Sequence, residues 1–232
     1  MDEAVNRALG MLEGPRAQYV VTPNTEIVWR CQKDAALAQA IRSADLVLPD
    51  GIGVVYAGRI LGTPIRERVP GIDFICNLFS RIVGTDKKVF LLGAQPGVAD
   101  QAAENLCARY PGLKICGTEN GYFTDDAAVI DKINASGADI LLVCLGFPKQ
   151  ECWMNRNASR LNVKLMAGLG GSLDVFAGVV RRAPKRWQQR GFEWLYRLLE
   201  NPTRIGRMMV LPAFMLTVIF RRLTRGRNKK ER

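Results

Sequence analysis

The sequence predicts an α/β fold: a doubly wound, mainly parallel sheet followed by a helical appendage. Two observations support this prediction. Short apolar runs alternate strictly with helix-length amphipathic stretches, and the apolar runs show little in–out alternation of polar and apolar residues. Strands covered by helices on both faces have this continuous apolar character. Strict alternation of strand and helix produces parallel strands with right-handed crossovers, as in Rossmann-like domains.

The predicted elements follow one another in order along the first part of the chain. Runs rich in Val, Ile and Leu predict strands over residues 18–22, 45–49, 88–93, 114–117, 139–146 and 163–168. Helical spacing predicts helices over residues 24–33, 52–61, 71–83, 97–109, 125–135 and 149–161, after a helix that opens the chain. From Arg181 onward the pattern is helical only. We therefore predict a Rossmann-like catalytic domain over 1–184 and an appendage over 185–232.

Charge is concentrated in the appendage. Residues 181–232 carry fifteen Lys/Arg against three Asp/Glu, whereas the first 180 residues have a net charge of −1. An apolar run at 208–220 lies between arginines and is interrupted by Pro212. It is shorter than the roughly 20 residues that cross a bilayer, so it is typical of an interfacial segment. We expect this end to bind an anionic membrane surface; a core helix with a solvated basic end is the alternative.

The residue types that are absent restrict the chemistry. Histidine is missing, so a general base must be Asp, Glu, Lys, Tyr or Cys. The six cysteines form no Cys-x-x-Cys pair, which is typical of small core residues in a reduced, cytoplasmic protein. No Asp-x-Asp motif is present to hold Mg²⁺ or Mn²⁺. We therefore expect no metal and no cofactor.

Five polar or glycine-rich clusters follow predicted strands. They are Thr22-Pro23-Asn24, Pro49-Asp50-Gly51, Gly93-Ala94-Gln95-Pro96-Gly97, Gly146–Glu151 and Gly168–Ser172. Ligands of open parallel sheets bind beyond the carboxyl ends of the strands, often at helix N-termini. We therefore expect all five clusters to face one crevice.

Asp50 is the strongest candidate for a chemical role. It follows a buried run and precedes Gly51, so its carboxylate is expected at the open edge, where it can accept a proton from an attacking hydroxyl. The alternative is that Asp50 caps the helix over 52–61. Thr22 and Asn24, on the neighbouring loop, have the same two interpretations. The sequence alone does not choose between them.

Other candidates are less specific. Arg68, in a loop before Pro70-Gly71, suits a phosphate but also suits solvent. Gly93, Gly170 and Gly171 allow the backbone to approach a nucleotide closely. Tyr122 suits stacking on a base or simple packing, and Asp174 suits a ribose hydroxyl or a helix cap. Arg197, Arg204 and Arg207 supply positive charge for a leaving diphosphate, with lipid headgroups as their alternative partner.

Taken together, the ordered motifs resemble the WecG/TagA/CpsF glycosyltransferase family. The resemblance covers about residues 4–220 and rests on Thr22-Pro23-Asn24, Leu48–Gly53, Arg68–Asp73, Gly146–Glu151 and Gly168–Gly171. Within the family, the chain most resembles the N-acetylmannosaminyltransferases of teichoic-acid synthesis. Family members begin with a further strand or hairpin, so we expect a truncated or internal start here.

The resemblance implies an inverting, metal-independent transfer of N-acetylmannosamine. The implied donor is UDP-N-acetylmannosamine, and the implied acceptor is N-acetylglucosamine on undecaprenyl diphosphate, at the inner face of the plasma membrane. Asp50 would be the base, while Thr22 and Gln150 would orient sugar and acceptor and Arg68 would contact acceptor or diphosphate. Tyr122 and Asp174 would hold uracil and ribose. Three appendage arginines, Arg197, Arg204 and Arg207, would close over the diphosphate.

Alternatives stay open at this point. Related enzymes use N-acetylmannosamine uronic acid or a capsular sugar, and the sequence does not fix the donor. A nucleotide-dependent oxidoreductase or methyltransferase shares the fold class, but the sequence lacks the dinucleotide fingerprint of oxidoreductases. The basic tail is also compatible with nucleic acid, although its apolar run favours a bilayer, so we expect no nucleic-acid partner. Self-association of the appendage into a homo-oligomer is a further possibility.

Overall fold

The computed structural model describes residues 1–200, 202 and 205–228, and the chain divides into two compact units. The first unit contains Met1–Thr22, Ala36–Leu48 and Val69–Arg181. The second contains Pro23–Ala35, Pro49–Arg68 and the chain from Arg182 on. The second unit thus joins the C-terminal helices to two segments from the first third of the sequence. The predicted boundary at residue 184 stays a prediction.

The first unit is built on a six-stranded, all-parallel sheet, which confirms the predicted fold class. Its strands are β1 (Gln18–Val21), β2 (Leu46–Val47), β3 (Lys88–Gly93), β4 (Lys114–Glu119), β5 (Ile140–Cys144) and β6 (Leu165–Gly168). They lie in the order β2-β1-β6-β5-β3-β4. Because every strand runs in the same direction, their carboxyl ends meet at one edge of the sheet.

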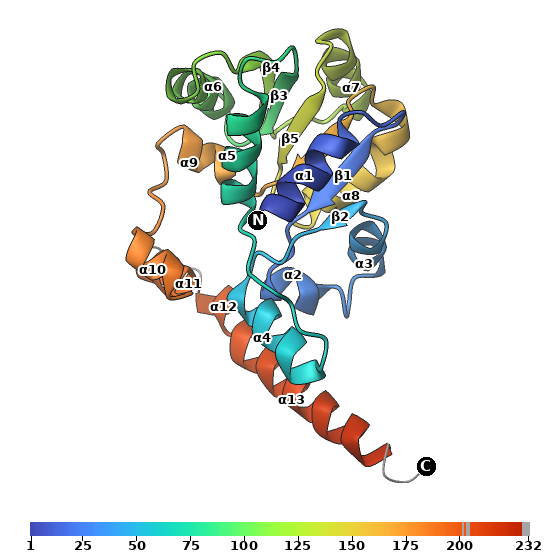
Figure 1. The fold of residues 1–232 in the computed structure, drawn as a ribbon, viewed down its shortest axis with the longest axis vertical. Helices are drawn as coiled ribbons and strands as arrows, with labels where there is room; N and C mark the ends of the chain where they lie inside the picture. Colours follow the sequence, from blue (N-terminus) through green and yellow to red (C-terminus); the bar gives the residue numbers. More distant parts are fainter. Residues whose placement is uncertain (201, 203–204, 229–232) are drawn as a thin grey trace. The chain divides into compact units, whose positions relative to one another are not determined.

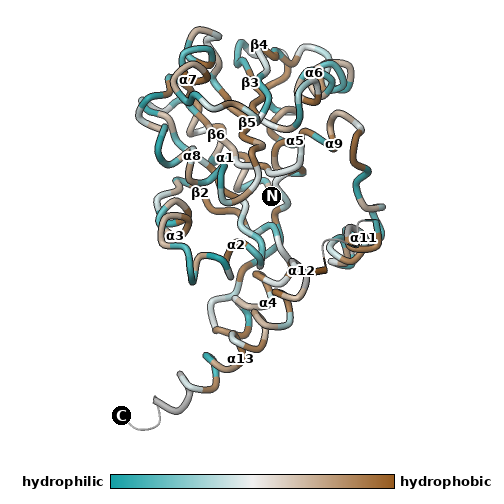
Figure 2. Tube along the Cα trace, turned by 180° about the vertical axis from the view of Figure 1, so that it is seen from behind, coloured by the Kyte–Doolittle hydropathy of each residue, from teal (hydrophilic) through white to brown (hydrophobic). Residues whose placement is uncertain are grey.

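Helices cover both faces of this sheet. They are α1 (Asp2–Met11), α3 (Ala35–Arg42), α5 (Gly71–Ile82), α6 (Val98–Arg109), α7 (Asp126–Ala135), α8 (Lys149–Asn157) and α9 (Ser172–Phe176), with a 3₁₀ turn at Ala158–Arg160. Alternate residues of β3 enter different cores: Val89 and Leu91 pack with α1, α5 and α6, whereas Phe90 and Leu92 pack with α7 and α8. Both side-chain rows are therefore buried, which explains the continuous apolar strands. Figure 2 shows β3 and β5 as predominantly hydrophobic segments.

The second unit consists of helices. They are α2 (Thr25–Arg30), α4 (Ile52–Leu61), α10 (Lys185–Gln189), α11 (Glu193–Glu200), α12 (Ile205–Met208) and α13 (Val210–Asn228). A small core joins Ala57 of α4 to Phe214 and Val218 of α13. Val28 and Trp29 of α2 pack against it. Helix α13 is thus seated on helices from the first third of the chain (Figure 1).

Several boundaries differ from the sequence predictions. Strand β2 has only two residues where five were expected, and β4 continues to Glu119, beyond the predicted end at 117. Helix α3 was not predicted, because it is short and lies between two stronger patterns, and no range was predicted for the helix at Asp174, which is α9. The helix predicted over 149–161 ends as an α-helix at Asn157. Among the described residues, no helix combines the length and apolar character needed to cross a membrane.

Candidate functional site

The second unit contains a cavity of about 180 Å³ in which charged and apolar residues meet. It is lined by Asn24, Thr25, Glu26, Asp50, Gly51, Ile52, Gly53, Arg68, Gly191, Glu193, Trp194, Val210 and Leu211. The lining therefore combines three of the predicted site residues with a stretch of the appendage around α11. A neutral, hydroxyl-rich group suits such a cavity, because carboxylates accept hydroxyl hydrogen bonds and aromatic side chains cover apolar faces.

Asp50 lies in this cavity and does not occupy the N-cap of α4. The helix starts at Ile52, its N-cap is Gly51, and no side chain caps it. The Asp50 side chain is 35% exposed, and its Oδ1 lies 3.8 Å from Nη2 of Arg68. The sequence left a capping role and a chemical role open, and the geometry of α4 does not support the capping role.

Arg68 is the cation of this cavity in the part of the chain that the structure describes. Its side chain is 15% exposed, and its Nη2 donates a 2.6 Å hydrogen bond to Oε2 of Glu193. Within the described residues, the buried Nε of Arg68 has no hydrogen-bond partner. Nη2 of the guanidinium is therefore held by Glu193, while Nε is a buried donor that no group among the described residues satisfies.

Asn24 takes the capping role that the sequence offered, and its predicted role in binding substrate stays a prediction. Its Oδ1 accepts a hydrogen bond of 3.0 Å from Ile27 N, which caps α2, and the residue also lines the cavity. The cap keeps the α2 N-terminus beside Asp50, since Asp50 N donates to Pro23 O at 3.3 Å. The loops that carry Asn24 and Asp50 are thus joined through their backbones.

The first unit contains a separate cavity of about 630 Å³. Its lining is Ala94, Gln95, Gly121, Tyr122, Phe123, Cys144, Leu145, Gly146, Lys149, Gly170, Gly171 and Asp174. These residues follow β3, β4, β5 and β6, so the cavity lies at the carboxyl edge of the sheet, where parallel α/β folds bind ligands. Gly170 has a φ of 54°, and a Cβ at this position would meet no atom within 4 Å, so its backbone lies open to the cavity.

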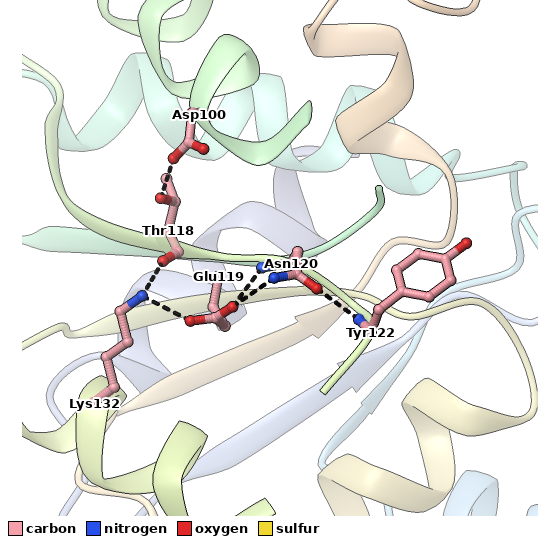
Figure 3. Close-up of polar contacts among 6 residues, drawn as sticks. All are labelled: Asp100, Thr118, Glu119, Asn120, Tyr122 and Lys132. Atoms are coloured by element: carbon pink, nitrogen blue, oxygen red, sulfur yellow. Dashed lines mark hydrogen bonds and ion pairs between the residues drawn. The ribbon is translucent and has the colours of Figure 1, made fainter. Parts of the chain in front are cut away.

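Tyr122 is presented on a braced loop (Figure 3). Lys132 Nζ donates to Glu119 Oε2 at 2.7 Å, and Glu119 Oε1 accepts from Asn120 N and Nδ2. Asn120 Oδ1 then accepts from Tyr122 N at 2.9 Å. The backbone of Tyr122 is fixed in this way while its side chain is exposed and its hydroxyl accepts from Gln95 Nε2 at 2.6 Å. Such a ring is available to stack on a flat ligand.

Gln150 is placed differently from the expectation. It is 3% exposed, its Nε2 donates to Glu151 Oε1 at 2.9 Å, and its Oε1 accepts from Gly170 N at 2.9 Å. Both ends of the amide are therefore used inside the first unit. Gln150 holds the glycine loop after β6 in place, and its predicted role in orienting sugar and acceptor stays a prediction.

Two further predicted residues serve the sheet itself. Thr22 is buried, and its hydroxyl donates to Gly168 O at 2.9 Å, which ties the ends of β1 and β6. Gly93 has a φ of 133°, and a Cβ there would lie 2.3 Å from Cys144 O. Gly93 is therefore required for the close approach of β3 to β5, while its neighbours Ala94 and Gln95 line the cavity.

The cavities divide the five predicted clusters between the two units. The clusters after β3, β5 and β6 line the cavity of the first unit, and those containing Asn24 and Asp50 line the cavity of the second. The single crevice stays a prediction. Arg204 lies outside the described residues, as do the side chains of Arg197 in α11 and Arg207 in α12.

Several cavity residues were not singled out as site residues in the sequence, although Lys149 lies within the predicted cluster Gly146–Glu151. Lys149 donates to Gly121 O at 2.9 Å and lies 4.7 Å from the centre of the Phe123 ring, so it braces the Tyr122 loop. Glu193 and Trp194 have no motif that marks them as cavity residues. Cys144 also lines the cavity, but burial raises the pKa of its thiol to about 12, so it remains a neutral, unreactive group.

The chain belongs to the WecG/TagA/CpsF glycosyl transferase family, whose model matches residues 1–228. It is 36% identical over 208 residues to the N-acetylglucosaminyldiphosphoundecaprenol N-acetyl-beta-D-mannosaminyltransferase of Bacillus spizizenii, covering 90% of this chain and 81% of that relative. The proteins of the same name from Bacillus subtilis and Staphylococcus aureus (strain MRSA252) are 35% and 37% identical. Those alignments cover 91% and 86% of this chain and 81% and 79% of the relatives. The chain is thus a glycosyltransferase.

Proposed function

We propose that this enzyme transfers N-acetylmannosamine from UDP-N-acetylmannosamine to N-acetylglucosamine on undecaprenyl diphosphate, with inversion at the anomeric carbon. Such a transfer builds the linkage unit of a wall teichoic acid. The relatives' names support the acceptor and the transferred sugar. The observation that carries the proposal is the placement of Asp50, which lines a cavity beside Arg68 and leaves the cap of its own helix to Gly51.

In this proposal Asp50 is the general base. Its carboxylate accepts the proton of the acceptor hydroxyl, the hydroxyl oxygen attacks the anomeric carbon of N-acetylmannosamine, and the bond from that carbon to UDP breaks. Arg68, which lines the same cavity, binds an oxygen of the acceptor or of the diphosphate. UDP leaves with the electron pair of the broken bond, and the proton remains on Asp50 until it is released to solvent.

The cavity of the first unit is proposed to bind the donor nucleotide. The exposed ring of Tyr122 stacks on uracil, and Asp174 accepts a hydrogen bond from a ribose hydroxyl. Gly170 and Gly171 bring backbone close to the diphosphate. The appendage arginines Arg197, Arg204 and Arg207 offset the charge of the leaving UDP, so we propose that no metal ion and no cofactor takes part.

Membrane docking is proposed for α13. Its side chains Leu216, Phe220 and Leu223 are 66–68% exposed, and Arg221 and Arg222 beside them are also exposed. An apolar row next to cations suits the surface of an anionic leaflet, where a polyprenyl-linked acceptor is found.

The decisive experiment measures transfer of radiolabelled N-acetylmannosamine from its UDP donor to a short-chain lipid-diphosphate N-acetylglucosamine. We expect wild-type activity to survive EDTA. Asp50→Asn should lower the rate on the order of 10²–10⁴-fold, because the amide cannot accept the proton. The UDP-induced rise in melting temperature should persist in Asp50→Asn, because Asp50 is not part of the donor cavity.

Asp86→Asn is the matched control, because Asp86 is a fully exposed carboxylate on a surface loop. A near-normal rate for Asp50→Asn would remove Asp50 from the mechanism. Absence of transfer by the wild-type enzyme would reject the proposed reaction.

A further inference from the structure

Two carboxylates approach the same nitrogen of Arg68. Glu193 Oε2 lies 2.6 Å from Nη2, and Asp50 Oδ1 lies 3.8 Å from it. The Glu193 side chain is 10% exposed, against 35% for Asp50. Arg68 is therefore hydrogen-bonded to the more buried carboxylate, while its contact with Asp50 lies beyond hydrogen-bond length.

In this arrangement Arg68 pairs tightly with Glu193 and only loosely with Asp50. A charge-assisted hydrogen bond to a buried carboxylate is among the stronger polar contacts in proteins. If Glu193 were neutral or absent, Arg68 would be a largely buried cation lacking that partner, which is costly. Asp50 is the other carboxylate within ion-pairing distance in the described part of the chain, so a short swing would bring Arg68 into a tight pair with it.

We propose that Glu193 is a positioning residue for sugar transfer. It holds Arg68 through Nη2 and so prevents Arg68 from forming a tight ion pair with the carboxylate of Asp50. The inference rests on the proposed function, since it assigns Asp50 the role of base and Arg68 that of a substrate contact. It adds a third charged residue to that site, contributed by the appendage helix α11.

The surroundings of Glu193 agree with a role in the cavity. Glu193 is the first residue of α11, and its neighbours Gly191 and Trp194 line the same cavity. The charged groups that line it in the described residues are Glu26, Asp50, Arg68 and Glu193. Glu193 thus links the position of helix α11 to the positions of the charged side chains around Asp50.

The test compares Glu193→Gln with Glu200→Gln. Both substitutions remove one negative charge from α11, but Glu200 is exposed and bonds to Tyr196 of its own helix. We expect Glu193→Gln to lower kcat about 10–100-fold, because misplacing a reacting group by roughly 1 Å can cost that much. The KM for the UDP-sugar should stay unchanged. Glu193→Asp, which keeps the charge, should lose less, and Glu200→Gln should match the wild type.

Measurements in an Arg68→Ala variant separate a positioning role of Glu193 from a merely structural one. In Arg68→Ala, adding Glu193→Gln should lower the single-turnover rate less than about 2-fold, because interacting residues are non-additive. Excess enzyme keeps such slow rates measurable. If Glu193 acts through contacts other than Arg68, its substitution will cost the same factor with and without Arg68, and that result would overturn the proposal.

The same assay distinguishes failure of the proposed reaction from failure of the role proposed for Glu193. A wild-type enzyme that transfers no N-acetylmannosamine would reject the proposed function itself. A wild-type enzyme that transfers normally, together with a Glu193→Gln variant as active as Glu200→Gln, would reject only the role of Glu193.

Discussion

Glu151 is a carboxyl group that the fold places in an apolar setting. It is 1% exposed, its Oε1 accepts the hydrogen bond from Gln150, and its Oε2 has no partner among the described residues. Burial raises the pKa of Glu151 above its ordinary value, because the charged form is poorly solvated there. The folded protein therefore favours a neutral acid beside Gln150.

The raised pKa of Glu151 predicts a pH dependence of stability. Above the unfolded pKa of 4.5 the unfolded chain releases this proton while the folded chain still holds it. The free energy of unfolding should therefore fall as the pH rises from that value to the raised folded pKa. Glu151→Gln should flatten the decline, as measured by urea unfolding at pH 5 and pH 8. The absence of histidine from the sequence keeps this window clear of imidazole titration.

Glu200→Gln is the control for Glu151→Gln, because it removes an exposed carboxylate and should leave the pH dependence of unfolding unchanged. Equal slopes for the wild type and Glu151→Gln would show that Glu151 is already ionised in the folded protein at pH 5.

How far single residues can be predicted depends on the range of their contacts. Asp50 was identified because a buried run followed by Asp-Gly is a local pattern, and the structure was needed to show that Gly51, not Asp50, is the N-cap of α4. Glu193 was not identified, because its partner Arg68 lies 125 residues away in the sequence. Gln150 was identified as a site residue, but burial of both ends of its amide depends on Glu151 and on the loop after β6.

At the scale of elements, prediction succeeded where a local pattern and the tertiary environment agree. Strand β3 and helix α4 span the predicted residues 88–93 and 52–61, since β3 is buried on both faces and α4 lies between Gly51 and a left-handed Gly62. Strand β2 is shorter than expected, because Val47 is 46% exposed and Leu48 already belongs to the loop. Apolar composition alone does not reveal where pairing to a neighbour ends.

Helix α13 has two faces with different roles. Phe214 and Val218 are 5% exposed and pack in the small core with Ala57, whereas Leu216, Phe220 and Leu223 are exposed. The exposed three are spaced four and three residues apart, so they form one row along the helix. Substituting only this row leaves the packing of α13 on α4 intact.

We therefore predict that Leu216→Gln, Phe220→Gln and Leu223→Gln together weaken binding to anionic vesicles. Burial of each such side chain contributes up to about 1.5–3 kcal/mol, so the loss should be on the order of 10²-fold or more. Vesicle flotation measures it. A Val179→Gln, Val180→Gln variant is the control, because these exposed valines belong to the first unit. Unchanged flotation of the triple variant would exclude this face of α13 as the docking surface.

At the scale of the whole molecule, the chain builds its second unit from three separated segments. The segments Pro23–Ala35 and Pro49–Arg68 follow β1 and β2, respectively, and the third begins at Arg182. Alternation of strands and helices predicted the sheet, but it gave no sign that α2 and α4 would share a core with α13. That association depends on contacts between side chains that are far apart in the sequence. The periodicity of apolar residues within one segment does not show which distant segment it will pack against.

This construction predicts what removal of residues 182–232 will do. The cavity containing Asp50 would lose Gly191, Glu193, Trp194, Val210 and Leu211, whereas every residue lining the cavity of the first unit would remain. The truncated protein should therefore keep its UDP-induced rise in melting temperature and lose transfer below detection. Removal of α13 also uncovers Ala57 and its apolar neighbours on α4, so the truncated protein should be less soluble.

Full-length enzyme carrying Glu200→Gln is the control for this truncation, because it alters α11 without deleting any cavity residue. Transfer at the wild-type rate by the truncated protein would contradict the assignment of α11 to the catalytic site, since the Arg68–Glu193 contact would then be dispensable. Loss of UDP binding together with transfer would instead show that donor binding depends on the appendage, through its arginines or through the folding of the first unit. The comparison of UDP binding with transfer therefore assigns donor recognition and acceptor chemistry to different parts of the chain.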